Sequence, residues 1–298
     1  MSTVLSLSQI SKSYGKVQAL RDVSFSVPEG SVFGILGPNG SGKTTLLSIV
    51  LDVLKADRGD YSWLGQPGSP AQRKKIGSLL ETPNFYHYLS AVDNLRVTQS
   101  ISGRGTPEDI DRVLRKVNLF ERRKSRFKSY SLGMKQRLAI AASLLGDPKV
   151  LVLDEPTNGL DPVGIAEIRE LITELRNSGH TIIMASHLLD EVEKVCTHVA
   201  ILKTGELLTT GDVNEVMQDE DIVEAGAADL AALARALAPF SNAVHVDPVS
   251  NTASFALPKG SAHLEEINRH CFEQGLVLRH LLLKKKRLET RFFELTNN

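Results

Sequence analysis

The sequence Gly37-Pro38-Asn39-Gly40-Ser41-Gly42-Lys43-Thr44-Thr45 fits the pattern G-x-x-x-x-G-K-S/T, a glycine-rich loop that leads into a helix. The glycines allow successive backbone N–H groups to converge on one point, and the mainly apolar residues 46–50 predict a helix whose N-terminus adds partial positive charge. Lys43 can reach the β- and γ-phosphates of a nucleotide, and the Thr44 hydroxyl can coordinate Mg²⁺. Residues 31–36 before the loop predict a buried strand. We therefore interpret the loop as a nucleotide-phosphate site rather than an ordinary glycine-rich turn.

The composition indicates a globular protein with balanced charge. Hydrophobic residues make up 42% of the 298 residues, and 35 Lys and Arg match 35 Asp and Glu, which gives no support for nucleic acid or acidic lipid as a partner. No apolar run approaches the roughly 18–20 residues that cross a bilayer, and residues 1–10 lack the features of a signal peptide. Cys196 and Cys271 have no C-x-x-C spacing, which favours ordinary thiols of a reducing compartment. We therefore expect a cytoplasmic protein with no nucleic-acid partner.

The residues before the loop predict an antiparallel hairpin. Residues 4–10 and 17–27 alternate apolar and polar positions on either side of Tyr14-Gly15-Lys16. An aromatic at a strand end, such as Tyr14, is usually half-buried for packing. Because this hairpin directly precedes the phosphate loop, we interpret Tyr14 as a platform for the adenine ring.

An acidic pair ends a second buried strand. Residues 150–153 (VLVL) are all apolar, which is typical of a central strand in a parallel sheet, and Asp154 and Glu155 follow them. Both carboxylates are thus expected at the carboxyl end of the strand, beside the phosphate loop. Asp154 is suited to hold Mg²⁺ through water, and Glu155 to polarise an attacking water. A third buried strand, 181–185, precedes His187 and points it toward the same site.

Two further regions complete the chain. Residues 89–147 have a mainly helical pattern with a helix start at Pro107, and we place a helical subdomain at about 84–147. Composition changes near residue 220, and the remainder predicts the order βαββαβ, which matches a ferredoxin-like split βαβ unit. We therefore expect one domain at 1–219 and a smaller α+β accessory domain at 220–298.

The octapeptide Tyr130-Ser131-Leu132-Gly133-Met134-Lys135-Gln136-Arg137 narrows the class of nucleotide site. Together with Asp154-Glu155 and His187, it resembles the ATP-binding cassette (ABC) family, whose signature is usually Leu-Ser-Gly-Gly-Gln followed by Gln-Arg. The second, fourth and last two residues of the octapeptide match that signature, whereas Tyr130, Leu132 and Met134 depart from it. Gly159-Leu160-Asp161 also resembles the family's D-loop. The resemblance covers about residues 4–215.

This resemblance implies an α/β fold of the P-loop ATPase type, with a mostly parallel core sheet, an antiparallel β subdomain and a helical subdomain. It implies ATP hydrolysis with Mg²⁺. In one protomer, ATP would contact Tyr14, Asn39, Gly40, Ser41, Gly42, Lys43, Thr44 and Thr45. In the opposite protomer, it would contact Ser131, Gly133 and Asp161. The implied catalytic residues are Glu155, His187 and Lys43, and the implied Mg²⁺ contacts are Thr44, Asp154 and Glu81.

Glu81 departs from the family pattern, which usually has glutamine after the strand at residues 75–80. Glutamine offers a neutral carbonyl to Mg²⁺ and an amide to the attacking water, whereas Glu81 adds a negative charge that favours Mg²⁺ but is repelled by the γ-phosphate. The same substitution, with Ser-Leu-Gly-Met-Lys signatures, occurs in the branch resembling bacitracin-resistance and lantibiotic-immunity exporters. The closing segment 288–296 resembles the end of that branch's extra domain.

The leading hypothesis is therefore the ATPase subunit of an ABC exporter, working as a pair of identical or related nucleotide-binding domains. Its membrane partner would be a separate permease that docks near Glu81 and Phe85-Tyr86 and holds the chain at the inner face of the membrane. The alternative is a non-transport ABC ATPase acting on DNA or ribosomes, but the usual coiled-coil or zinc insertions and second cassette are missing. The domain at 220–298 would stabilise the dimer or sense a small molecule.

Overall fold

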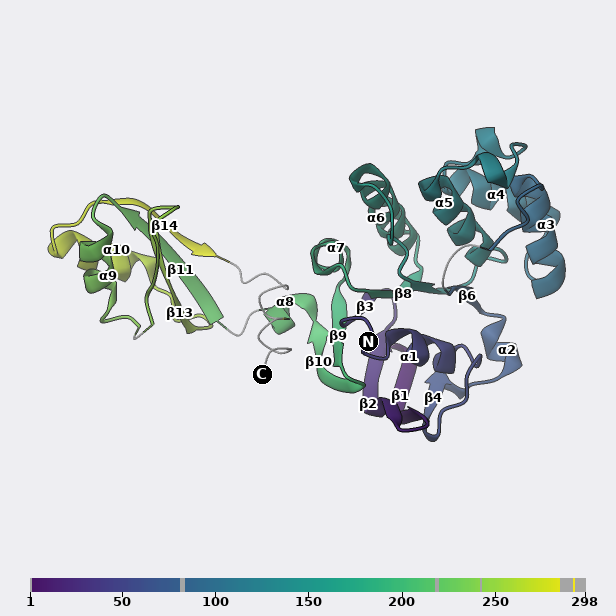
Figure 1. Cartoon of the computed structure of the whole chain (residues 1–298), viewed down its shortest axis with the longest axis horizontal. Coiled ribbons are helices and arrows are strands. Elements are labelled where there is room, and N and C mark those ends of the chain that lie inside the picture. Colours follow the sequence, from purple (N-terminus) through teal and green to yellow (C-terminus); the bar gives the residue numbers. More distant parts are fainter. Residues whose placement is uncertain (1, 81–83, 218–219, 242, 285–291, 293–298) are drawn as a thin grey trace. The chain divides into compact units, whose positions relative to one another are not determined.

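Contacts divide the chain into two units, Met1–Asp212 and Val213–Asn298 (Figure 1). The computed structural model describes residues 2–80, 84–217, 220–241, 243–284 and 292. The change in composition placed the division later, between residues 219 and 220. The short helix α8 (Val213–Met217) accounts for the difference, because it groups with the second unit.

A mostly parallel sheet forms the centre of the first unit, and within the described residues its strand order is β10-β9-β3-β8-β7-β6. The strands are β3 (Val32–Leu36), β6 (Ile76–Leu79), β7 (Val150–Asp154), β8 (Thr181–Ser186), β9 (His198–Lys203) and β10 (Glu206–Asp212). Only the β9–β10 pair is antiparallel among these pairings. Every residue of β3, β7 and β8 is buried, as their apolar runs predicted. The predicted α/β class is confirmed.

A helix follows each of three parallel strands: α1 (Lys43–Val50) follows β3, α6 (Pro162–Asn177) follows β7, and α7 (Leu189–Val195) follows β8. Because β3, β8 and β7 are neighbours and run in the same direction, their carboxyl ends meet at one edge of the sheet. In open α/β sheets this edge is where ligands bind.

An antiparallel sheet with the order β2-β1-β4-β5 packs against the same core. Its strands are β1 (Thr3–Tyr14), β2 (Val17–Pro28), β4 (Arg58–Trp63) and β5 (Gln66–Pro67), and the short helix α2 (Pro70–Arg73) follows. The hairpin predicted around Gly15 is confirmed, with Tyr14 paired to Val17. The sequence did not predict β4, because only Trp63 of this strand is fully buried and its other residues show no apolar alternation.

The helical part predicted at about 84–147 contains α3 (Ala91–Ser102), α4 (Pro107–Lys116), η1 (Phe120–Arg122), η2 (Phe127–Ser129) and α5 (Leu132–Ser143). Helix α4 begins at Pro107, as predicted, and is held by a capping box between Thr106 and Asp109. Helix α5 begins after Ser131, whose hydroxyl accepts a hydrogen bond from the Met134 N–H (3.3 Å). Within the described parts of the chain, no helix combines the length and apolar character needed to cross a membrane.

The second unit has its own sheet and its own apolar core. After α8, its elements are β11 (Glu220–Ala227), α9 (Leu230–Leu237), β12 (His245–Asp247), β13 (Thr252–Pro258), α10 (Leu264–Glu273) and β14 (Leu278–Lys284). The strands pair antiparallel in the order β12-β13-β11-β14, and α9 and α10 contribute Leu233 and Ile267 to the core. The assignment to the ferredoxin-like fold stays a prediction. The segment predicted at 288–296 lies outside the described residues except for Phe292.

Trp63, the one tryptophan in the sequence, connects the antiparallel sheet to the end of α1. It is 1% exposed, and its indole N–H donates a hydrogen bond to the Val50 carbonyl (2.8 Å). We expect Trp63→Phe to lower the free energy of unfolding by about 1–3 kcal/mol, because the buried carbonyl loses its donor. Urea unfolding followed by circular dichroism measures this loss. Tyr88→Phe is the control because Tyr88 is exposed, and equal stability of the two variants would contradict the prediction.

Candidate functional site

The phosphate loop connects the end of β3 to the start of α1. At two of its positions a residue with a side chain would be unfavourable, and both positions are glycine. Gly40 and Gly42 have φ angles of 81° and 102°, in the left-handed region that favours glycine. A Cβ on Gly42 would lie 2.5 Å from the Ala19 carbonyl oxygen on β2. The Gly205 N–H, in the turn between β9 and β10, donates to the Ser41 carbonyl (3.1 Å). The loop is therefore held in shape from both sheets.

A cleft of about 370 Å³ opens over this loop. Its lining brings together eight residues that the sequence named and one that it missed, Ala19. The lining residues are Tyr14, Ala19, Asn39, Gly40, Gly42, Lys43, Thr44, Thr45 and Glu155. Ser41 does not line the cleft. It is 1% exposed beneath the loop, and no hydrogen-bond partner for its hydroxyl is found among the described residues.

Lys43 is a buried cation at the base of the cleft. Its side chain is 6% exposed, and its ammonium group donates to the carbonyls of Gly37 (2.8 Å) and Pro38 (3.3 Å). Glu155 Oε1 lies 3.8 Å from Lys43 Nζ. Burial lowers the pKa of Lys43, and the nearby Glu155 and Asp154 carboxylates partly oppose this effect. The charge of Lys43 is thus only partly compensated, which suits an incoming phosphate.

Asp154 and Thr44 form an oxygen pair beside Lys43. The Thr44 hydroxyl donates to Asp154 Oδ2 (3.0 Å), and Asp154 is 4% exposed at the end of β7. Across the described ranges, no cluster of three or more His, Cys, Asp or Glu side chains forms a separate metal site. Mg²⁺ at a nucleotide site usually binds one or two protein oxygens together with phosphate oxygens and water. The Thr44–Asp154 pair fits that requirement.

Glu155 and His187 form the second polar pair of the site. His187 Nδ1 lies 2.8 Å from Glu155 Oε2. Since an ionised carboxylate can only accept, the shared proton is best placed on Nδ1, and His187 then donates. Glu155 has a φ of 48°, which is uncommon for a residue other than glycine. Its N–H donates a hydrogen bond to the Ala185 carbonyl (3.0 Å). Such strain tends to occur where geometry serves function.

Tyr14 stands at the rim of the cleft, 51% exposed at the end of β1. The Lys12 ammonium lies 5.9 Å from the centre of its ring. The exposed ring is available as a stacking surface, and its contact with adenine stays a prediction.

Ser131, Gly133 and Asp161 do not line this cleft. Ser131 is the N-cap of α5 and Gly133 lies in its first turn. Asp161 is the N-cap of α6, where its carboxylate accepts from the Gly164 N–H (2.9 Å). The Ser131 hydroxyl accepts a hydrogen bond and can still donate one to an anion, whereas the Asp161 carboxylate offers acceptors only. All three residues are exposed or partly exposed, so another molecule can reach them.

Glu81 was predicted to belong to the site, whereas Gly205 and Ala19 were not. Glu81 lies outside the described residues, so its predicted contact with Mg²⁺ stays a prediction. The sequence did not predict the hydrogen bond from Gly205 to the phosphate loop, and it did not predict Ala19 in the cleft. No local pattern reports either contact, because both depend on pairing between distant strands.

Comparisons with known proteins agree with this geometry. The family model described as ABC transporter matches residues 20–158. The chain is 41% identical over 205 residues to the lantibiotic transport ATP-binding protein SrtF of Streptococcus pyogenes, covering 69% of this chain and 89% of that protein. It is 31% identical over 301 residues to the bacitracin transport ATP-binding protein BcrA of Enterococcus faecalis, covering 99% of this chain and 97% of that protein. The solved structure of cbiO1 from Clostridium perfringens, part of an ABC transporter complex, is 30% identical with a TM-score of 0.66, covering 72% of this chain and 91% of that one.

The parallel sheet, the phosphate loop and the acidic pair define a P-loop nucleotide hydrolase. The matches narrow this class, and the chain belongs to the ATP-binding subunits of ABC transporters, which are ATPases.

The two left-handed glycines of the loop, Gly40 and Gly42, provide a matched test of its geometry. Gly42→Ala adds both an unfavourable φ and a clash with the Ala19 carbonyl, whereas a Cβ on Gly40 meets no atom within 4 Å. We expect Gly40→Ala to lower the free energy of unfolding by about 1–2 kcal/mol and Gly42→Ala by clearly more. Urea unfolding followed by Trp63 fluorescence measures both. Equal losses would show that the close approach to Ala19 adds nothing.

Proposed function

We propose that this chain is the ATP-hydrolysing subunit of an ABC exporter related to those that handle bacitracin and lantibiotics. The observation that carries the proposal is the pairing of Glu155 with His187 (2.8 Å) beside Lys43 and the Thr44–Asp154 pair. The match to BcrA supports it further, because that match extends over both units of this chain. Both relatives reported above are named for transport, which favours this assignment over an ATPase acting on DNA or ribosomes.

In the proposed mechanism, the loop N–H groups and Lys43 bind the β- and γ-phosphates of ATP, and Tyr14 stacks on the adenine. Thr44 and Asp154 hold Mg²⁺, which when bound neutralises charge on the phosphate oxygens. Glu155 accepts a proton from the attacking water, and His187 orients the Glu155 carboxylate through its Nδ1–H. His187 Nε2 then remains available to contact the γ-phosphate.

The proposed working form is a pair of such chains. Ser131 and the Gly133 N–H, at the N-terminus of α5, would contact the γ-phosphate bound by the opposite protomer, since orphan N–H groups and the helix dipole favour an anion there. Asp161 offers acceptors only, so it fits a donor of the opposite protomer better than a phosphate oxygen. ATP would thus close the dimer, and hydrolysis would open it.

The proposed membrane partner is a separate permease, which would hold the chain at the cytoplasmic face of the membrane. A groove of about 320 Å³ in the helical part suits the docking of a short permease helix. Tyr86 and Ile101 at this groove are 50% and 80% exposed, so both side chains can contact a docked partner. The groove also includes Phe85, which the sequence had named for this role.

Glu155→Gln tests the proposed base. The amide preserves size but cannot accept the proton, so we expect steady-state ATP hydrolysis to fall on the order of 100-fold or more while ATP affinity stays within about threefold. Phosphate release and binding of a fluorescent ATP analogue measure the two effects. The control is Glu121→Gln, which changes an exposed carboxylate on η1. Hydrolysis near the unmodified rate in Glu155→Gln would refute the assigned role.

The membrane partner is tested with the same variant, because it should hold ATP in the closed state. We expect Glu155→Gln, purified with Mg-ATP in detergent from its native cells, to retain a polytopic membrane protein that mass spectrometry identifies. Omitting ATP is the control. Recovery of ribosomal or DNA-associated proteins without a membrane protein would favour the non-transport alternative.

A further inference from the structure

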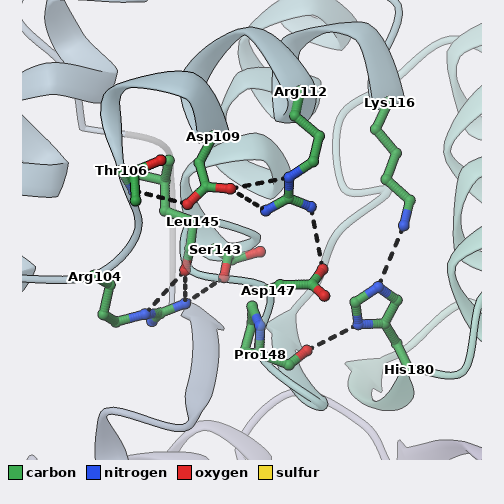
Figure 2. Close-up of polar contacts among 10 residues, drawn as sticks. All are labelled: Arg104, Thr106, Asp109, Arg112, Lys116, Ser143, Leu145, Asp147, Pro148 and His180. Carbon is green, nitrogen blue, oxygen red and sulfur yellow. Dashed lines mark hydrogen bonds and ion pairs between the residues drawn. The ribbon is translucent and has the colours of Figure 1, made fainter.

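Arg104, in the loop between α3 and α4, makes an unusual set of contacts. Its guanidinium donates to the carbonyls of Leu145 (2.7 and 3.1 Å) and Ser143 (2.7 Å), as Figure 2 shows, and to the carbonyl of Ile76 (2.8 Å) on β6. The side chain is half-buried, and no ion pair with a carboxylate is found for it within the described residues. Among the described residues, every acceptor of Arg104 is thus a backbone oxygen.

These carbonyls lie where α5 ends. Ser143 is the last residue of α5, and the final carbonyls of a helix have no partner within the helix. They also form the negative end of the helix dipole, which favours a cation. A guanidinium suits this position because its planar fork can donate to several acceptors at once, which a lysine ammonium matches poorly. Arg104 therefore caps the C-terminal end of α5 and at the same time ties it to β6.

The backbones around Arg104 are in direct contact, so little else separates α5 from β6. A Cβ on Gly77 of β6 would clash with the Ser143 carbonyl, the same oxygen that Arg104 binds. On the other side, a Cβ on Gly105 would lie 2.9 Å from the Gly146 N. The loop that carries Arg104, the end of α5 and β6 therefore form one close-packed junction.

The neighbouring cations of this region make different contacts (Figure 2). Arg112 pairs with the carboxylates of Asp109 (2.7 Å) and Asp147 (3.1 Å). Lys116 Nζ lies 3.3 Å from His180 Nε2, and His180 Nδ1 lies 2.8 Å from the Pro148 carbonyl oxygen. These contacts connect α4 with the segments around β7 and β8, whereas Arg104 also donates a hydrogen bond to β6.

We propose that Arg104 is a positioning residue that acts through α5 on Ser131. The inference rests on the proposed contact of Ser131 with the nucleotide of the opposite protomer. A helix of 12 residues such as α5 is about 18 Å long, so a tilt of about 5° at its C-terminal end moves its N-terminal end by about 1.5 Å. A displacement of that size is enough to disrupt a hydrogen bond to phosphate. By tying Ser143 and Leu145 to Ile76, Arg104 sets the direction in which α5 presents Ser131.

The test uses the full-length Glu155→Gln chain, in which ATP is bound but not hydrolysed. Arg104→Met, Arg104→Lys, Ser131→Ala and Arg112→Met are each added to it. Binding of a fluorescent ATP analogue to dilute protein reports the site around Lys43, and sedimentation at increasing concentration with Mg-ATP reports dimer formation. We expect Arg104→Met to weaken dimer formation about tenfold, like Ser131→Ala, while ATP binding stays within about twofold. Arg104→Lys should restore part of the loss, and Arg112→Met should leave dimer formation unchanged.

Combining the variants separates positioning from general stability. We expect Arg104→Met with Ser131→Ala to be no worse than Ser131→Ala, because both changes remove the same contact. If Ser131→Ala weakens the dimer and Arg104→Met does not, the role of Arg104 is wrong and the proposed function stands. If Ser131→Ala leaves the dimer intact, the contact between protomers is wrong, and the role of Arg104 falls with it. Loss of ATP binding together with dimer formation in both Arg104 variants would show a general structural role instead.

Discussion

Compensation of the buried charge of Lys43 is the constraint on which the rest of the first unit depends. A cation that is 6% exposed is costly unless acceptors surround it, and the acceptors here come from separate parts of the chain. The phosphate loop supplies the Gly37 and Pro38 carbonyls, and the end of β7 supplies Glu155. The sheet must therefore bring β3 and β7 to one edge before Lys43 can be buried. The same acceptors leave room for a stronger partner, since carbonyl dipoles and a carboxylate at 3.8 Å compensate an ammonium less well than phosphate oxygens in direct contact.

The register of the parallel strands is what brings the ends of β3 and β7 to the same edge of the sheet. Leu36 of β3 pairs with Ser186 of β8, and Asp154 of β7 pairs with Ala185. The three strands consequently end at nearly the same level, so that the phosphate loop, Glu155 and His187 all begin at that edge. A slip of one residue in β7 would turn the Asp154 side chain to the other face of the strand and remove its contact with Thr44. The buried, apolar composition of these strands thus serves the site as well as stability.

Much of this arrangement could be predicted because its signals are local. Three short segments each indicate a secondary-structure element and the point where a strand ends. They are the glycine loop, the apolar run before Asp154 and the strand before His187. The features that were missed depend on distant pairs: Ala19 approaches Gly42 from β2, and Gly205 reaches Ser41 from a hairpin far along the chain. Strand β4 was missed because its exposed polar residues hide the single buried Trp63. Arg104 was missed for a related reason, since an arginine that binds only backbone carbonyls leaves no complementary acidic residue in the sequence.

Helix α5 has a feature that a local sequence signal predicts at one end and a feature that depends on distant contacts at the other. At its N-terminus, the Ser131 hydroxyl already accepts from the Met134 N–H, so the side chain is oriented before any ligand arrives while its proton remains free to be donated. At its C-terminus, Arg104 satisfies carbonyls that the helix itself leaves unpaired. An anion is favoured at the first end and a cation at the second, which is the distribution of charge that the helix dipole prefers. The sequence reveals the first end through a recognisable motif and conceals the second, although a helix can present Ser131 in a fixed direction only if both ends are held.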